Sequence, residues 1–204
     1  MVEVCRFSGR RGFTITCLRV DQYGPADPDD VRKAATAKTI LISIIHAGDE
    51  VGTIEPISEI GKIAKRAQVC LHTDGMQAAG HIPVDVDKLK VDQLSILVHR
   101  FCEPEGVGAP YVRKGTELVS LMQGGEQENR RRAGTENAPA ILGLGKAVAE
   151  ALVVFHPSTC TARSWPRRHS NRRLRITWHA KNQKKGRRNL QALHSLSILF
   201  HADD

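Results

Sequence analysis

The stretch Val69-Cys70-Leu71-His72-Thr73-Asp74-Gly75-Met76-Gln77 decides how the chain is interpreted. A short apolar run ends in a carboxylate, a glycine and, two residues later, an amide. This order is typical of a buried parallel strand that delivers polar groups at its carboxyl end, where ligands bind in open α/β sheets. Asp74 could meet a cationic ring nitrogen there, with Gln77 as a nearby hydrogen-bond partner. Alternatively, Asp74 only caps the segment that follows, and these nine residues alone favour capping.

Segments with the patterns of strands and helices alternate on either side of this stretch. The strand-like segments are residues 13–20, 39–45, 93–98 and 107–112, and the helix-like segments are residues 29–37, those starting at Pro56 and at about Met76, a short turn within 84–89, and residues 136–154. This alternation predicts an α/β fold with a mostly parallel sheet and helices on both faces.

The charge is distributed unevenly along the chain. Residues 1–155 hold 19 of the 30 basic and 20 of the 22 acidic residues, a net charge of −1, so residues 156–204 carry +9. We therefore predict a body over residues 1–154 and a basic tail of low order over residues 155–204, apart from a candidate helix over 190–200. Paired arginines and lysines in the tail could bind nucleic-acid phosphates, but no binding motif accompanies them, which favours a solvated extension.

Composition excludes several classes of protein. The 204 residues are 41% hydrophobic and 25% charged, as in soluble globular proteins, and no apolar run approaches the length of a membrane span. Five cysteines without a C-x-x-C pair suggest neither a disulfide framework nor a zinc site, and Cys17 and Cys70 lie in apolar runs typical of the core. No signal peptide is seen, so a cytoplasmic location is expected, with a mitochondrial origin left open.

Six segments occur in the same order as the signature motifs of one enzyme family. They are His46-Ala47-Gly48-Asp49-Glu50-Val51-Gly52-Thr53-Ile54, His72-Thr73-Asp74-Gly75-Met76-Gln77, Pro83-Val84-Asp85-Val86, Gly106-Val107-Gly108-Ala109, Gly124-Gly125-Glu126-Gln127-Glu128 and Arg131-Arg132-Ala133-Gly134-Thr135-Glu136-Asn137. Together they resemble the cysteine desulfurases and selenocysteine lyases (NifS-like), pyridoxal-phosphate enzymes of the class V aminotransferase group. The resemblance covers roughly residues 10–153.

The resemblance implies a fold, a chemistry and a set of site residues. The fold is part of the large domain of fold-type-I pyridoxal-phosphate enzymes, which are homodimers, and the chemistry removes sulfur from cysteine, or selenium from selenocysteine, leaving alanine. Asp74 would pair with the pyridinium nitrogen, so that the ring acts as an electron sink, and Gln77 would bind the phenolic oxygen. His99 would contact the phosphate, Thr135 would reach the phosphate of a neighbouring subunit, and Asp49 replaces an asparagine at a cofactor-binding position.

The sequence also departs from the family pattern. The position of the Schiff-base lysine holds Arg100, whose guanidinium stays protonated and cannot act as an amine nucleophile. Leu97 replaces a phosphate-binding serine, and Glu126 replaces a glycine. The family's N-terminal segment and C-terminal small domain are not matched. These departures predict a truncated and inactive homologue; the alternative is a non-catalytic binding or dimerisation module whose basic tail contacts nucleic acid or another partner.

Overall fold

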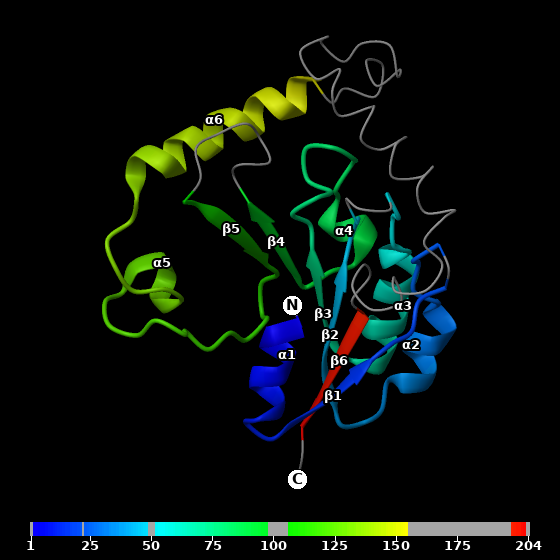
Figure 1. The fold of residues 1–204 in the computed structure, drawn as a ribbon. Coiled ribbons are helices and arrows are strands. Elements are labelled where there is room, and N and C mark those ends of the chain that lie inside the picture. Colours follow the sequence, from blue (N-terminus) through cyan, green and yellow to red (C-terminus); the bar gives the residue numbers. More distant parts are fainter. Residues whose placement is uncertain (1, 22, 49–51, 98–105, 155–196, 203–204) are drawn as a thin grey trace.

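A six-stranded sheet forms the centre of the computed structural model, which describes residues 2–21, 23–48, 52–97, 106–154 and 197–202 (Figure 1). The strand order is β1-β6-β2-β3-β4-β5. The strands are β1 (Phe13–Cys17), β2 (Thr39–Ile45), β3 (Cys70–Asp74), β4 (Gln93–Leu97), β5 (Gly108–Val112) and β6 (Ser197–Ala202).

Most of the strands run in the same direction. β2 and β3 are parallel, as are β3 and β4, whereas β5 is antiparallel to β4. β6 is antiparallel to both β1 and β2, so these two neighbours point the same way. β1, β2, β3 and β4 therefore share one direction, which confirms the predicted α/β class with a mostly parallel sheet.

Six helices accompany the sheet within the described residues. They are α1 (Val2–Gly9), α2 (Pro28–Ala34), α3 (Ile57–Ala67), α4 (Val86–Leu89), α5 (Gln127–Arg130) and α6 (Ala138–Val154). α2 and α4 both pack against α3, and Figure 1 shows these three on one side of the central strands, with α1, α5 and α6 on the other. No helix within the described residues is both long enough and apolar enough to cross a bilayer.

The core lies between the central strands and α3. Ile42 and Ile44 of β2 and Leu71 of β3 are fully buried, and they pack in one cluster with α3. α3 supplies Ile57, Ile60, Ile63 and Ala64 at the spacing of one helix face, as its sequence predicted. Gly61 lies on the same helix, and a Cβ there would be 2.3 Å from the backbone oxygen of Leu89, so α3 and α4 approach each other closely at this glycine.

The structure corrects three local predictions. The helix expected from about Met76 is a run of turns, in which Ala78 and Ala79 both donate to the Gly75 oxygen and Gly80 then adopts a positive φ of 78°. Cys17 is exposed and Cys70 is half-buried, so neither is a fully buried core residue as predicted. The expected helix over residues 190–200 is wrong for its last part, because residues 197–202 form β6.

The strand β6 was misread because of the spacing of its apolar residues. Leucines at positions 193, 196 and 199 suggest a helix, but the consecutive Ile198, Leu199 and Phe200 equally suit a strand covered on both faces. Pairing with β1 and β2 decides between the two, and both partners lie more than 150 residues away in the sequence. Residues 190–196 lie outside the described residues.

Candidate functional site

The carboxyl ends of three neighbouring parallel strands form one edge of the sheet. Ile45 at the end of β2 is in register with Asp74 at the end of β3, and Asp74 is in register with Ser95 of β4. Ligands bind at such edges in open α/β sheets. Of the positions that the family resemblance assigns to the site, Asp74, Gln77 and Thr135 are described, whereas Asp49, His99 and Arg100 lie outside the described residues.

Asp74 is held at this edge by its own backbone and by its carboxylate. The residue is 7% exposed. Its backbone oxygen accepts from the His46 amide at 2.8 Å, and the next amide, that of Gly75, donates to the Ser95 oxygen at 2.9 Å. One carboxylate oxygen, Oδ1, accepts from the Met76 amide at 3.0 Å. The capping interpretation thus accounts for Oδ1, and no second donor among the described residues contacts the carboxylate.

Next to Asp74, a histidine bridges the three strands on the same face of the sheet. Ser43 Oγ of β2 lies 2.8 Å from His72 Nδ1, and His72 Nε2 lies 3.0 Å from Ser95 Oγ of β4. Burial lowers the pKa of His72, an effect that the charge of Asp74 opposes. The ring is therefore neutral near pH 7, with one nitrogen donating and the other accepting. We refer to Ser43, His72 and Ser95 as the polar bridge.

A second histidine at this edge has an unused polar atom. His46 is 4% exposed and directly follows β2, and its backbone also accepts from the Glu55 amide at 2.9 Å. Its side-chain Nδ1 is buried and has no hydrogen-bond partner among the described residues. Burial lowers the pKa of His46, so the ring is neutral. A buried ring nitrogen without a partner is costly, which makes it a candidate contact for a bound polar group.

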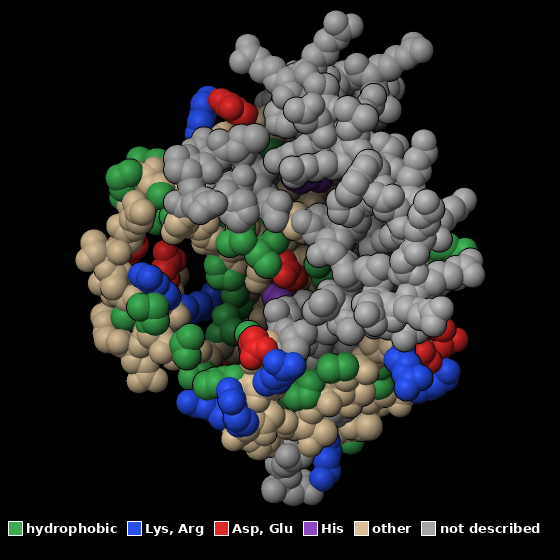
Figure 2. All heavy atoms as spheres, in the orientation of Figure 1, with side chains coloured by type: hydrophobic (Ala, Val, Ile, Leu, Met, Phe, Trp, Pro, Cys, Tyr) green, Lys and Arg blue, Asp and Glu red, His purple; other side chains and the backbone are tan. Residues whose placement is uncertain are grey.

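Gln77 and Thr135, the other two described residues that the resemblance assigns to the site, lie in different parts of the fold. Gln77 is half-buried in the turn that follows Asp74, so these two side chains belong to one local unit. Thr135 is exposed between α5 and α6, a segment that Figure 1 shows on the far side of β5 from β3. In Figure 2 an acidic and a histidine side chain lie together in the middle of the visible face, over the central strands, with a hollow beside them.

The edge residues fit one end of an aromatic, cationic cofactor. A buried carboxylate, a neutral bridging histidine and a second buried histidine with an unused nitrogen give acceptors and a donor within one small region. Gly75 lets the turn pack closely on β4, because a Cβ there would lie 2.5 Å from Leu94 Cδ1. These groups suit a protonated ring nitrogen. The groups predicted to bind the phosphate either lie outside the described residues, as His99 does, or are exposed, as Thr135 is.

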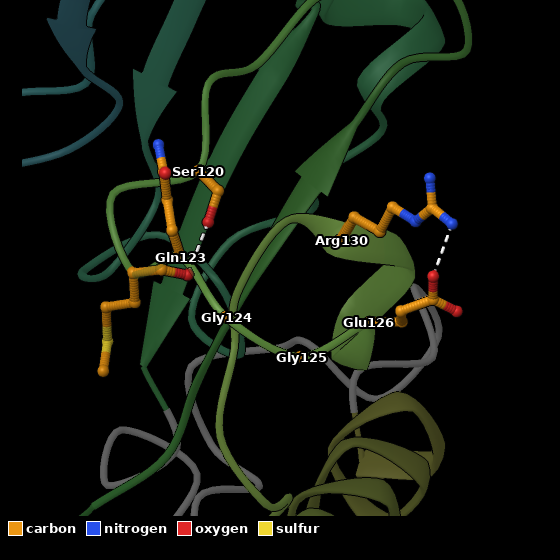
Figure 3. Close-up of a pocket in the computed structure, with 7 residues that line it drawn as sticks. Ser120, Gln123, Gly124, Gly125, Glu126 and Arg130 are labelled. Atoms are coloured by element: carbon orange, nitrogen blue, oxygen red, sulfur yellow. Dashed lines mark hydrogen bonds and ion pairs between the residues drawn. The ribbon is translucent and has the colours of Figure 1, made fainter.

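The loop before α5 encloses a separate hollow (Figure 3). Its volume is about 580 Å³, and it is lined by Ser120, Met122, Gln123, Gly124, Gly125, Glu126 and Arg130. Arg130 and Glu126 point toward each other and form an exposed ion pair, and Ser120 Oγ donates to the Met122 oxygen at 2.7 Å. Exposed pairs of this kind stabilise little. The hollow is lined by Gly124 and Gly125 of the glycine motif but by no buried titratable side chain. The strand edge at Asp74 is therefore the better candidate for a reactive site.

The structure offers no metal centre in the part of the chain that it describes. No group of three or more histidine, cysteine, aspartate or glutamate side chains is placed to hold an ion there. The spacings of His46, His72 and His81 in the sequence, 26 and 9 residues, fit no pattern of metal ligands and predict structural histidines at these positions. His72 is fully engaged by two serines, and His81 contacts the Ala79 oxygen at 3.3 Å.

The fold and the strand-edge carboxylate define part of the large domain of a fold-type-I pyridoxal-phosphate enzyme, and comparison with known proteins identifies the family. The model of the aminotransferase class-V family matches residues 2–152, so the chain belongs to this family. Members of the family depend on pyridoxal phosphate.

Curated relatives are cysteine desulfurases. The chain is 55% identical over 153 residues to cysteine desulfurase IscS of Dictyoglomus turgidum, covering 75% of this chain and 39% of that protein. It is 50% identical over 161 residues to cysteine desulfurase IscS of Methanosarcina thermophila, covering 79% of this chain and 40% of that protein. The chain thus spans about two fifths of the length of these relatives.

Solved structures share the fold. One described as SspA in complex with cysteine has a TM-score of 0.70 at 39% identity, covering 72% of this chain and 43% of that one. A NifS-like protein has a TM-score of 0.72 at 35% identity, covering 75% and 42%. DndA from Streptomyces lividans has a TM-score of 0.72 over 99% of this chain and 72% of its own, but at 21% identity it supports the fold alone.

Proposed function

We propose that this chain is a partial large domain of the cysteine desulfurase or selenocysteine lyase type that retains the ring-binding end of a pyridoxal-phosphate site but does not carry out desulfuration. The observation that carries the proposal is Asp74, a 7% exposed carboxylate at the carboxyl end of a central parallel strand. Pyridoxal phosphate supplies an electron-withdrawing ring. The cysteine desulfurase relatives support a site of this kind.

In this proposal the chain's own residues hold the ring and its proton. Asp74 faces a protonated ring nitrogen with the carboxylate oxygen that the Met76 amide does not use, which keeps the proton there. The polar bridge ties β3 to β2 and β4 and so fixes the carboxylate. Gln77 binds the phenolic oxygen, His46 Nδ1 offers one further contact, and His99, Asp49 and Thr135 bind around the phosphate.

The proposed loss of activity depends on Arg100. Covalent attachment of the cofactor needs a neutral primary amine near its aldehyde, and a buried lysine can supply one because burial lowers its pKa. A guanidinium stays protonated at any ordinary pH. Lys114 is the next lysine in the sequence, and it is exposed just after β5, at the end of the strand that runs away from the Asp74 edge.

The experiment is to mix the purified chain with pyridoxal phosphate, reduce with borohydride, and map any modified peptide by mass spectrometry. We expect reversible binding without a trapped adduct at the Asp74 edge, and no sulfide release from cysteine. Arg100→Lys should become trappable at position 100 but should not regain full turnover, since Leu97 and Asp49 still depart from the family pattern. Lys114→Arg is the control and should change nothing. A trapped adduct on the unmodified chain together with sulfide release would refute the proposal.

A non-catalytic role as a dimerisation module is the second candidate, and exposed apolar side chains favour it. Val119 and Leu121 are 92% and 95% exposed, and Leu142 on α6 is 75% exposed. Exposed apolar groups of this size often mark protein contacts. We propose that two copies meet through the segment 118–122 and α6. Sedimentation equilibrium should show a dimer that dissociates in Leu121→Glu, whereas Leu121→Met should leave it intact; a monomer in both would exclude this role.

A further inference from the structure

The strand β6 comes from the far end of the chain and lies between two strands of the body. On one side it pairs with β1, from Phe13 opposite Ala202 to Cys17 opposite Ile198. On the other side it pairs with β2, from Thr39 opposite His201 to Ile44 opposite Ser197. Both edges of β6 are therefore used for backbone pairing, although the 42 residues 155–196 separate it from α6 in the sequence.

β6 also attaches the N-terminal elements to the sheet. In the strand order of the described residues, β1 has β6 as its neighbour and does not pair directly with β2. α1 packs on β1. The backbone pairing that joins α1 and β1 to the Asp74-bearing strands thus runs through the C-terminal segment.

We propose that the gap between β1 and β2 is a strand-binding site for an extended, antiparallel peptide, and that the chain's own segment Ser197–Ala202 is its resident ligand. Two facing strand edges present two rows of backbone donors and acceptors, which recognise an extended chain on both sides at once. The register irregularity between Thr39 and Leu41 of β2 fixes where the ligand strand pairs.

The sequence of the resident segment suits this site. Ser-Ile-Leu-Phe-His-Ala has three consecutive apolar residues with high strand propensity and no proline or glycine. The link of 42 residues can span well over 100 Å when extended, at about 3.3 Å per residue, so it does not constrain the segment to any one position. The pairing itself therefore selects the site.

A disulfide test checks the register in the full chain. Position 198 is directly opposite Cys17, and Cα atoms so placed in an antiparallel pair are about 4.5–5.5 Å apart, within disulfide range. Cys17 is an exposed free thiol. Ile198→Cys should therefore oxidise to a bond with Cys17, found by non-reducing peptide mapping of monomeric protein. Leu199→Cys is the matched control, because Thr16 is opposite that position.

The two variants give a clear decision. We expect at least tenfold more of the Cys17-linked peptide from Ile198→Cys than from Leu199→Cys. Equal linkage in both variants, or no linkage to Cys17 in either, would overturn the proposal. Linkage found only in covalent dimers would also overturn it, because the resident ligand would then be the tail of a second copy.

A second test displaces the resident strand. Leu199→Pro removes a backbone donor from the middle of β6, and proline is not tolerated inside a strand paired on both sides. A fluorescent peptide of residues 195–204 should bind this variant at least tenfold more tightly than it binds the unmodified chain, whose site is filled. Hydrogen exchange should show loss of protection in β1 while β3 stays protected. Equal peptide binding by both proteins, or unchanged protection of β1, would contradict the proposal.

Discussion

The two faces of the central strands differ in what they carry. On one face, Ile42, Ile44 and Leu71 point toward α3 and are fully buried in the apolar cluster. On the other face, Ser43, His72 and Ser95 of three neighbouring strands form the polar bridge beside Asp74. A strand places successive side chains on opposite faces, so one short sequence such as Cys70–Asp74 serves both.

Stability and the geometry of the site therefore share one backbone, but each of them depends on different side-chain contacts. The apolar face stabilises the fold by burial of hydrocarbon, which does not depend on direction. The polar face depends on hydrogen bonds whose partners are set by the register of three strands. Substitutions on the first face should thus change stability most, and substitutions on the second should change the site while costing less.

The largest effect is expected from Leu71→Ala on the apolar face. Leu71 is fully buried, and its truncation leaves a cavity, so the free energy of unfolding should fall by about 2–5 kcal/mol. Urea denaturation followed by circular dichroism measures this change. Val4→Ala is the control, since Val4 is 60% exposed, and it should change stability by less than about 0.5 kcal/mol. Equal effects of the two substitutions would show that the apolar face has been assigned wrongly.

A smaller loss is expected from Gly61→Ala, also on the apolar face. The added Cβ would lie 2.3 Å from the Leu89 oxygen, so α3 and α4 must separate, at a cost of about 1–3 kcal/mol. Gly145 on α6 has open space around it, and Gly145→Ala should raise stability by about 0.5–1 kcal/mol through helix propensity. Thermal melts of both variants give the comparison, and a stabilising Gly61→Ala would contradict the packing described for α3 and α4.

Much of the secondary structure could be predicted from the sequence. The apolar run of residues 39–45 coincides with β2, and the predicted helix over residues 136–154 begins two residues later, at Ala138. Periodicity succeeds here because burial of one face imposes it locally. The short α1 and α5 were not anticipated. The second and third residues of α5, Glu128 and Asn129, adopt positive φ angles of 49° and 57°, which no propensity for right-handed helix predicts.

The polar face could be predicted only in part. Asp74 and Gln77 stand in a recognisable motif at the end of a strand-like run, and the structure places Asp74 at the strand edge. The polar bridge was missed because Ser43 and Ser95 lie 29 and 23 residues from His72, and only the strand register brings them together. The spacing of the histidines predicts a satisfied structural histidine at position 46, whereas the burial of its Nδ1 without a partner depends on tertiary packing that no sequence pattern encodes.

On the polar face, Ser43→Ala should weaken both the fold and the fixing of Asp74. Removal of the hydroxyl leaves His72 Nδ1 without this partner in a part-buried position, at a cost of about 1–2 kcal/mol. Ser120→Ala, whose hydroxyl is exposed, should cost less than about 0.5 kcal/mol. Urea denaturation measures both. Pyridoxal-phosphate affinity should fall in Ser43→Ala and not in Ser120→Ala; an unchanged affinity would mean that the polar bridge does not position the site.

The smallest expected effect is the dependence of the free energy of unfolding on pH, and it tests His72 on the polar face. Burial lowers the pKa of His72 and of His46, so the folded chain keeps both rings neutral at a pH where the unfolded chain protonates them. The unfolded state then binds more protons, and stability must fall as the pH is lowered through the ordinary histidine pKa of about 6.5. Each histidine contributes at most about 1.4 kcal/mol per pH unit below that value.

The measurement is the free energy of unfolding at intervals between pH 7.5 and pH 5.5, a window above the ordinary titration range of aspartate and glutamate. His72→Gln should reduce the slope, because glutamine keeps hydrogen-bonding groups but does not titrate there. His81→Gln is the matched substitution, because the His81 ring contacts a backbone oxygen in the turn after Asp74 and lies outside the polar bridge. If His72→Gln leaves the slope unchanged, protonation of His72 does not destabilise the folded chain.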